Sequence, residues 1–289
     1  MIFLFLRIFS GTLVNVFQKK ITLKGANSLF IVTLTYLFLT IVMLPMLFFM
    51  PLKNINSNFW ITIIITAVLD AIGNIFLVKS LKLTELSIFG ILNSFKPVIA
   101  TILAIFMLKE MPNLFGIIGI SIIIIGSLIL TYKKKINKDN FNLEKVKGII
   151  YRFAGIFFSA SGAVYIKKAI AYSTPEISLF FWALFGLPFL TIPLILFFNK
   201  SIKINFEILK KQKINYFAIF VLYSLMQYFT ILVFKRNFVG YSLAIFQLSS
   251  IISIIFGYKF FNEKNIIIKL ISAFIMIGGA LLILYSKNW

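Results

Sequence analysis

The 289-residue chain contains no cysteine and no histidine, and it has only eight aspartates and glutamates. Disulfides, thiolate nucleophiles and thiolate or imidazole metal ligands are therefore excluded. The lack of histidine also removes the side chain that most often carries protons near neutral pH. All carboxylates except Asp70 lie at the ends of apolar runs or between them. We therefore expect no enzyme activity, no cofactor and no metal site.

Long apolar runs dominate the chain, of which 61% is hydrophobic. A helix needs about 20 apolar residues to cross a bilayer, and this sequence offers one such run after another. It therefore predicts a multi-pass protein of the inner or plasma membrane. The net charge of +21 could indicate nucleic-acid binding, but the lysines lie in the short links between apolar runs. That placement is typical of helix ends beside anionic lipid headgroups, so we expect membrane lipids as partners and no nucleic acid.

The apolar runs predict an all-α fold of ten transmembrane helices. Polar links separate them, including a charged segment after residue 132 and a second polar link at Asn199–Lys213. The predicted spans are about 2–18, 28–50, 59–78, 86–108, 114–132, 149–171, 176–198, 214–234, 239–261 and 265–285.

The two halves of the chain repeat each other. Residues 153 positions apart match in type, most clearly at polar positions such as Asn74 with Gln227 and Glu110 with Glu263. Five spans in each half place the second copy upside down in the membrane, and inverted repeats of this kind are typical of transporters. We therefore expect one five-helix repeat over residues 1–135, a charged linker over 136–147, and an inverted repeat over 148–289.

Asp70 and Lys96 are the leading candidates for a functional site. Each lies near the middle of an apolar run, on consecutive predicted helices and at similar depth. A lone charge at the bilayer centre costs roughly 2.5–3.5 kcal/mol on insertion scales, so the two side chains are expected to face inward and meet. They could bind a substrate or exchange a proton. A static ion pair between two helices is the alternative.

Other polar residues cluster around these charges. Pro97 follows Lys96 and should bend its helix and expose a carbonyl to a cavity. Asn74 lies one helical turn after Asp70, so it shares a face with it. The further candidates for the lining are Asn93, Ser94, Tyr223, Gln227 and Gln247. Any one of them could instead only join helices. Glu110 and Glu263, which follow the fourth and ninth spans, are interpreted as capped turns at the membrane surface.

Three local patterns resemble the EamA-type, ten-span permeases of the drug/metabolite transporter superfamily. The first is NVFQKK closing the first span, echoed by VYIKK in the second half. The second is SLKLTELSIFGILNSFKPVIATILAIFMLKE. The third is an acidic turn with its following helix, in KEMPNLFGIIGISIIIIGSLILTY and NEKNIIIKLISAFIMIGGALLILY. The resemblance implies transport of a small molecule by alternating access, as an exporter or exchanger that uses no ATP.

The sequence thus predicts a secondary-active transporter of a small metabolite such as an amino acid. A multidrug exporter of organic cations is one alternative, and a non-transporting enzyme or scaffold acting on lipids is another. A proton or a counter-substrate could drive the cycle, and the protein could be a monomer or a homodimer. Lysine counts in the links would place both termini outside, whereas the resemblance implies cytoplasmic termini, so orientation stays open.

Overall fold

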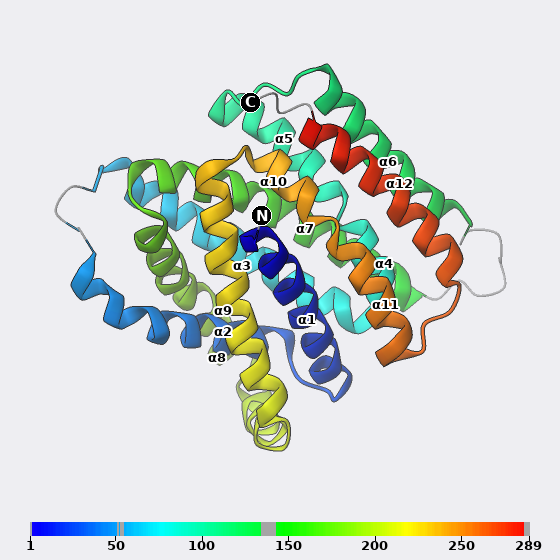
Figure 1. Cartoon of the computed structure of the whole chain (residues 1–289). Coiled ribbons are helices and arrows are strands. Elements are labelled where there is room, and N and C mark those ends of the chain that lie inside the picture. Colours follow the sequence, from blue (N-terminus) through cyan, green and yellow to red (C-terminus); the bar gives the residue numbers. More distant parts are fainter. Residues whose placement is uncertain (1, 51, 53–54, 134–142, 286–289) are drawn as a thin grey trace.

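The computed structural model describes residues 2–50, 52, 55–133 and 143–285, and within them it is helical and has no strand (Figure 1). In chain order the elements are α1 (Ile2–Leu23), α2 (Ser28–Met43), η1 (Leu44–Phe49), α3 (Asn58–Leu83), α4 (Leu86–Leu92), α5 (Phe95–Leu108), α6 (Leu114–Lys133), α7 (Leu143–Tyr172), α8 (Pro175–Lys211), α9 (Lys213–Arg236), α10 (Val239–Phe246), α11 (Ser249–Phe261) and α12 (Ile266–Tyr285).

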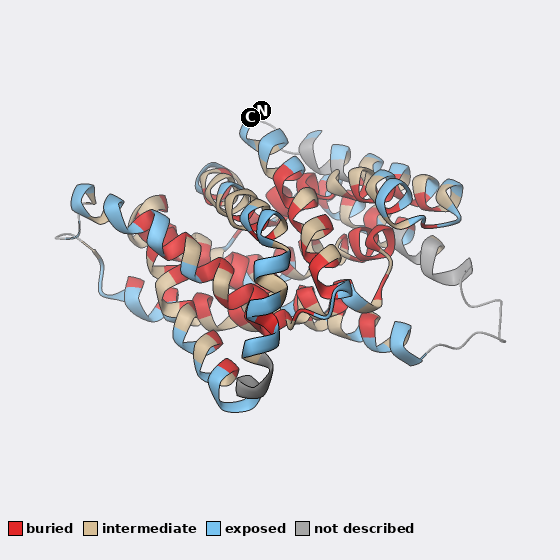
Figure 2. Cartoon of the chain, turned by 90° about the horizontal axis from the view of Figure 1, so that it is seen from below, coloured by how far each residue is buried: buried red, intermediate tan, exposed pale blue. Residues whose placement is uncertain are grey.

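Eight stretches of the described chain are long and apolar enough to cross a membrane. Three of them each combine two consecutive helical elements, as in Leu86–Leu108, which joins α4 and α5. Two further apolar stretches, Leu114–Gly126 in α6 and Ile266–Gly279 in α12, are shorter than the other eight. Many large apolar side chains face outward, for example Phe106, which is 80% exposed. Figure 2 shows the buried residues gathered inside the bundle. An apolar exterior of this extent suits contact with lipid.

Small residues allow the closest helix crossings. A Cβ atom added to Gly73 of α3 would lie 3.0 Å from the Ser159 amide nitrogen of α7, and one added to Gly155 would lie 3.1 Å from the Gly73 carbonyl oxygen. A Cβ atom on Gly279 of α12 would lie 2.5 Å from the carbonyl oxygen of Gly119 in α6, and these two helices run side by side (Figure 1). In both places the backbones approach as closely as they do because there is no side chain, a common device in membranes.

The helices extend beyond two of the predicted boundaries. The predicted polar link at Asn199–Lys213 is helical, because α8 continues to Lys211 and α9 begins at Lys213. Asn205 anchors the extension: its side-chain oxygen accepts a 2.7 Å hydrogen bond from the backbone nitrogen of Asn27. Similarly, α7 begins at Leu143, inside the predicted linker 136–147. The part of that linker before Leu143 lies outside the described residues.

Two of the predicted spans are interrupted near their middle. The α4–α5 stretch breaks at Asn93 and Ser94, and the α10–α11 stretch breaks at Gln247 and Leu248. At the first break the backbone nitrogen of Lys96 donates a hydrogen bond of 2.9 Å to the Asn93 carbonyl. Interrupted helices expose backbone groups, which is tolerated at membrane depth only inside protein or beside a water-filled cavity.

Candidate substrate cavity and its latches

A cavity of about 120 Å³ lies at these two breaks. Residues of the described N-terminal half, before residue 134, and of the C-terminal half, after residue 142, both line it. That volume has room for several water molecules or a small solute. Seven of the residues singled out from the sequence line it: Asp70, Asn74, Asn93, Lys96, Tyr223, Gln227 and Gln247.

Ser94 and Pro97 stand apart from the cavity lining. The buried hydroxyl of Ser94 donates to the Ile91 carbonyl over 2.6 Å. Pro97 is buried at the third position of α5. Its ring nitrogen carries no hydrogen, so it cannot bond to the Asn93 carbonyl one turn earlier. The backbone nitrogen of Lys96 donates to that carbonyl instead. The interruption at Asn93 and Ser94 lies within one helical turn before Pro97.

Asp70 lies in a space formed by Gly162. A Cβ atom on Gly162 would overlap the Asp70 Oδ1 atom, so the carboxylate lies directly on the α7 backbone. Lys96 interacts electrostatically with Asp70, and the Trp182 indole lies beside the carboxylate. The ion pairs formed by the described residues do not include a direct Asp70–Lys96 contact. The two charges therefore share the cavity without closing on each other.

A hydrogen-bonded group forms another part of the wall: Asn74, Tyr223 and Gln227 line the cavity, and Tyr36 lies outside the lining. The Asn74 amide donates to the Tyr36 hydroxyl over 3.1 Å, and the Gln227 amide donates to the Tyr223 hydroxyl over 3.0 Å. The rings of Tyr36 and Tyr223 have centroids 6.3 Å apart. Asn74 and Gln227, which match in the sequence repeat, thus approach a common pair of tyrosines from opposite halves. Sequence analysis does not single out Tyr36, because the position 153 residues later is Phe189, whereas Tyr223 stands 153 positions after Asp70.

Arg7 and Arg152 also line the cavity, and sequence analysis does not select them either. Their position inside apolar runs was the available signal, since such charges are functional candidates. The Arg7 guanidinium carbon lies 3.9 Å from the centroid of the Phe246 ring, and that of Arg152 lies 3.7 Å from the centroid of Phe89. Each arginine therefore packs on an aromatic ring of the opposite half.

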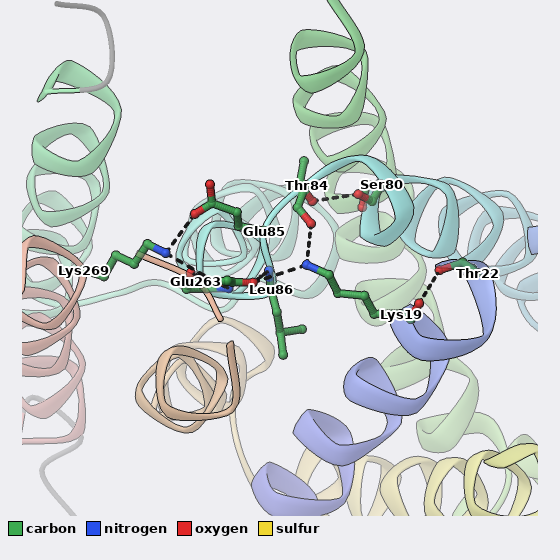
Figure 3. Close-up of polar contacts among 9 residues, drawn as sticks. Lys19, Thr22, Ser80, Thr84, Glu85, Leu86, Glu263 and Lys269 are labelled. Carbon is green, nitrogen blue, oxygen red and sulfur yellow. Dashed lines mark hydrogen bonds and ion pairs between the residues drawn. The ribbon is translucent and has the colours of Figure 1, made fainter. Parts of the chain in front are cut away.

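One end of the cavity-lining helices is held by a cluster around Glu263, which we call the Glu263 latch (Figure 3). It comprises Glu263, Lys19, Lys269 and the backbone of Thr84–Ser87. Lys19 Nζ lies 3.3 Å from Glu263 Oε1 and donates to the Thr84 carbonyl over 2.8 Å. The backbone nitrogens of Leu86 and Ser87, at the start of α4, donate to the Glu263 carboxylate. Lys269 bonds to Glu263 and also to Glu85.

A matching cluster, the Glu110 latch, comprises Glu110, Lys167, Asn237 and Val239. Lys167 forms an ion pair with Glu110 and donates to the Asn237 carbonyl over 2.6 Å. The Val239 nitrogen, at the start of α10, donates to Glu110 over 3.0 Å. Glu110, Asn237 and Val239 stand 153 positions from Glu263, Thr84 and Leu86 respectively. In each latch, a glutamate of one half caps a helix of the other half.

The two latches lie at opposite ends of the same candidate spans. Leu86, at the start of the Leu86–Leu108 stretch, bonds to Glu263, whereas Glu110 follows the end of that stretch. The Val239–Phe261 stretch has the reverse arrangement, with Val239 bound to Glu110 and Glu263 just after its end. The helix breaks and the cavity therefore lie between the two latches.

A residue with left-handed backbone conformation precedes each latch glutamate. Lys109 has φ of 56° and Asn262 has φ of 51°, and each ends a helix immediately before a latch glutamate. The backbone nitrogens of Glu110 and Glu263 donate back to the carbonyls of Ala104 and Gly257, six residues earlier. Each of these backbone bonds closes the helix end around its left-handed residue. The capped turns expected from the sequence are present, and in addition their glutamates join the two halves.

Glu263 lies in the link between α11 and α12, outside the candidate spans. Burial alone would raise the pKa of its carboxyl. The hydrogen bonds from Ser87 and the charges of Lys19 and Lys269 outweigh burial and hold the pKa below its ordinary value of 4.5. The carboxylate is therefore ionised at neutral pH, as the latch requires.

Comparison with known proteins identifies the family. The sequence profile of the EamA-like transporter family matches residues 1–132 and 146–285, which is nearly the whole chain. The chain belongs to the EamA-like transporter family. As a member, it is a multi-pass membrane protein of a transporter family, as the sequence predicts.

Other comparisons add the fold alone. No curated protein matches the sequence significantly. A solved structure described only as "Crystal structure of protein" superposes with a TM-score of 0.70, over 97% of this chain and 94% of the other, at 14% sequence identity. At that identity the likeness supports this helix arrangement for an EamA-like transporter and says nothing about the substrate.

Proposed function

We propose that this EamA-like protein is a secondary-active transporter, an exporter or exchanger, that carries a small metabolite such as an amino acid by alternating access. Ten transmembrane helices in two inverted repeats, residues 1–135 and 148–289, would form the bundle. Asp70 and Lys96 would be the charged centre of the site. Asn74, Asn93, Tyr223, Gln227 and Gln247 would complete its polar lining, with Ser94 and Pro97 at the helix break behind it.

The observation that carries this proposal is the cavity's position between two latches. A carrier must expose its site to one side at a time, so each end needs a contact that can form and break. The Glu263 and Glu110 latches join the two halves at opposite ends of the cavity-lining helices. Opening one latch while the other stays closed would expose the cavity on one side alone.

The alternative functions fit the geometry less well. An exporter of organic cations would favour a site dominated by Asp70, but Arg7, Lys96 and Arg152 line the same cavity. A lipid-modifying enzyme would need its polar groups to converge at headgroup level. The polar groups of this cavity instead converge at helix breaks between the latches. A scaffold, the remaining alternative, would need no cavity.

Alternating access can be tested without knowing the substrate, because the chain has no native cysteine. Asn15 lines the cavity, so Asn15→Cys provides a single thiol there. We would treat right-side-out and inside-out membrane vesicles with a membrane-impermeant maleimide. Labelling is expected from both sides. Glu263→Gln and Glu110→Gln should shift it in opposite directions, because each variant weakens one end.

Lys24→Cys provides the matched control, since Lys24 is exposed just after α1. This thiol should react from one side only, which verifies that the reagent stays impermeant and also fixes the orientation of the chain. Labelling of Asn15→Cys from a single side, unchanged by either latch variant, would mean a static pocket and would overturn the transport proposal.

A further inference from the structure

The cavity holds more positive than negative charge. Arg7, Lys96 and Arg152 line it, and Asp70 is the single carboxylate among its lining residues. Lys96 interacts electrostatically with Asp70 and with both arginines, so the four charges converge. If Asp70 balances Lys96, the two guanidinium groups are left without a counter-charge. A buried cation within a membrane protein is costly unless an anion accompanies it.

The contacts of Arg152 leave hydrogen-bond donors free. This side chain is 2% exposed, and its Nη2 atom donates to the Asn93 side chain over 2.6 Å. Its Nε and Nη1 atoms have no hydrogen-bond partner. Buried donors of this kind are normally satisfied, so an unpaired pair beside a cavity indicates a place for an acceptor. The Phe89 ring beneath the guanidinium stabilises its charge, but it provides no oxygen or nitrogen acceptor for the Nε and Nη1 hydrogens.

Arg7 belongs to the N-terminal half and is held by residues of the C-terminal half. Its Nε atom donates to the Thr230 hydroxyl over 3.2 Å, and its guanidinium lies on Phe246. Each arginine is thus fixed by its own ring and its own hydrogen-bond partner, and each belongs to a different half of the chain. The result is two separate cationic anchors, rather than one cluster on a single helix.

We infer that the substrate of the cavity is a small dicarboxylate, with one carboxylate held by Arg7 and the other by Arg152. This inference rests on the transport function proposed above and names its substrate class. Guanidinium groups suit carboxylates because their planar donors match the two oxygens. A ligand with two acidic groups would also join the halves across the cavity, as closure around a substrate requires. A dicarboxylate that also carries an ammonium group could place it beside Asp70.

The test is a thermal-shift titration of the purified full-length protein at constant ionic strength. The probes are succinate, aspartate, alanine, inorganic phosphate and choline. A saturable rise of the melting temperature is expected with succinate or aspartate, because ligands that bind the folded state stabilise it. Stronger stabilisation by aspartate than by succinate would show that Asp70 receives the ammonium group. Little or no rise is expected with alanine, phosphate or choline.

Variants locate the site. Arg7→Gln and Arg152→Gln should each weaken dicarboxylate binding by about tenfold or more. Lys20→Gln should leave binding unchanged, since Lys20 lies over the Phe17 and Phe260 rings and outside the cavity lining. If a glutamine variant proves unstable, Arg152→Lys keeps the charge and loses the planar donors, and weaker binding is still expected.

Three results would overturn the dicarboxylate assignment. One is the absence of any shift with succinate and aspartate in a well-folded sample. Another is equal or greater stabilisation by alanine, phosphate or choline. The third is unchanged dicarboxylate affinity in both arginine variants. The labelling of Asn15→Cys from the two membrane sides is a separate measurement that does not depend on the substrate. It therefore distinguishes failure of the dicarboxylate assignment from failure of the transport function.

Discussion

The carboxylate of Asp70 fills the space in which a side chain at position 162 would stand. A Cβ atom placed on Gly162 would overlap Asp70 Oδ1. Helix α7 therefore determines where the charge of α3 lies, and the absence of a side chain on α7 is part of the site.

Gly162→Ala should displace the Asp70 carboxylate and impair function while the protein still folds. Overpacking of this size costs about 1–3 kcal/mol, which a multi-helix bundle can sustain. The measurement is the dicarboxylate-induced thermal shift of the variant, beside its melting temperature without ligand. Gly278→Ala is the control, because nothing lies within 4 Å of a Cβ atom there. Ligand response as strong in Gly162→Ala as in the control would contradict the argument.

Asp70→Asn should abolish transport and leave the protein folded. The amide keeps the shape of the carboxylate but not its charge, so the balance against Lys96 is lost. We would measure exchange of labelled aspartate in proteoliposomes, together with the elution profile of the purified variant. Exchange at the wild-type rate would reduce Asp70 and Lys96 to a static pair that serves only structure.

The Glu263 latch should make stability depend on pH at the acid end. Its carboxyl has a lowered pKa in the folded protein, so its contribution is fully present above the ordinary value of 4.5 and is lost as the pH falls through the folded-state pKa. The melting temperature of the wild type should therefore fall on acidification below about pH 4.5. At neutral pH, Glu263→Gln should lower the free energy of unfolding by about 3 kcal/mol and so lower the melting temperature. The melting temperature of this variant should also depend less on pH in the acid range. Parallel pH profiles for the two proteins would argue against the latch.

Pro97→Ala should keep the break in the α4–α5 stretch. The equivalent break at Gln247 and Leu248 forms without a proline, so hydrogen bonding and packing are sufficient to interrupt the helix there. We expect a small change in melting temperature and unchanged maleimide labelling of Asn15→Cys in the same background. A substantial loss of labelling would show that the proline itself shapes the cavity.

The sequence points to Asp70 and Lys96, which line the cavity, because charged residues are conspicuous in apolar runs. Periodicity and charge located the apolar stretches, since a bilayer imposes a simple length rule. The helical extension of α8 to Lys211 was not predictable in this way, because polar residues outside the membrane are compatible with either helix or loop. The extension makes tertiary contacts that the sequence does not reveal, such as the hydrogen bond from the Asn27 backbone nitrogen to the Asn205 side chain.

Gly162 and Tyr36 could not be predicted from the sequence, because their roles depend on which helix faces which. Gly162 matters only because α3 brings Asp70 against it, and Tyr36 only because Asn74 and Tyr223 meet there. Glu110 and Glu263 are visible in the sequence as a repeated acidic turn. That each one caps a helix of the opposite half is a property of the assembled fold.

The exchange of caps between halves also has a consequence for biosynthesis. Lys19 and Glu263 are 244 positions apart, so at about 5–20 residues per second the ribosome needs roughly 12–50 s to make the second after the first. During that interval the start of α4 and the ammonium group of Lys19 have no partner from Glu263. The N-terminal half must therefore enter the bilayer with one polar end incomplete, and it acquires its final form only when almost the whole chain has been translated.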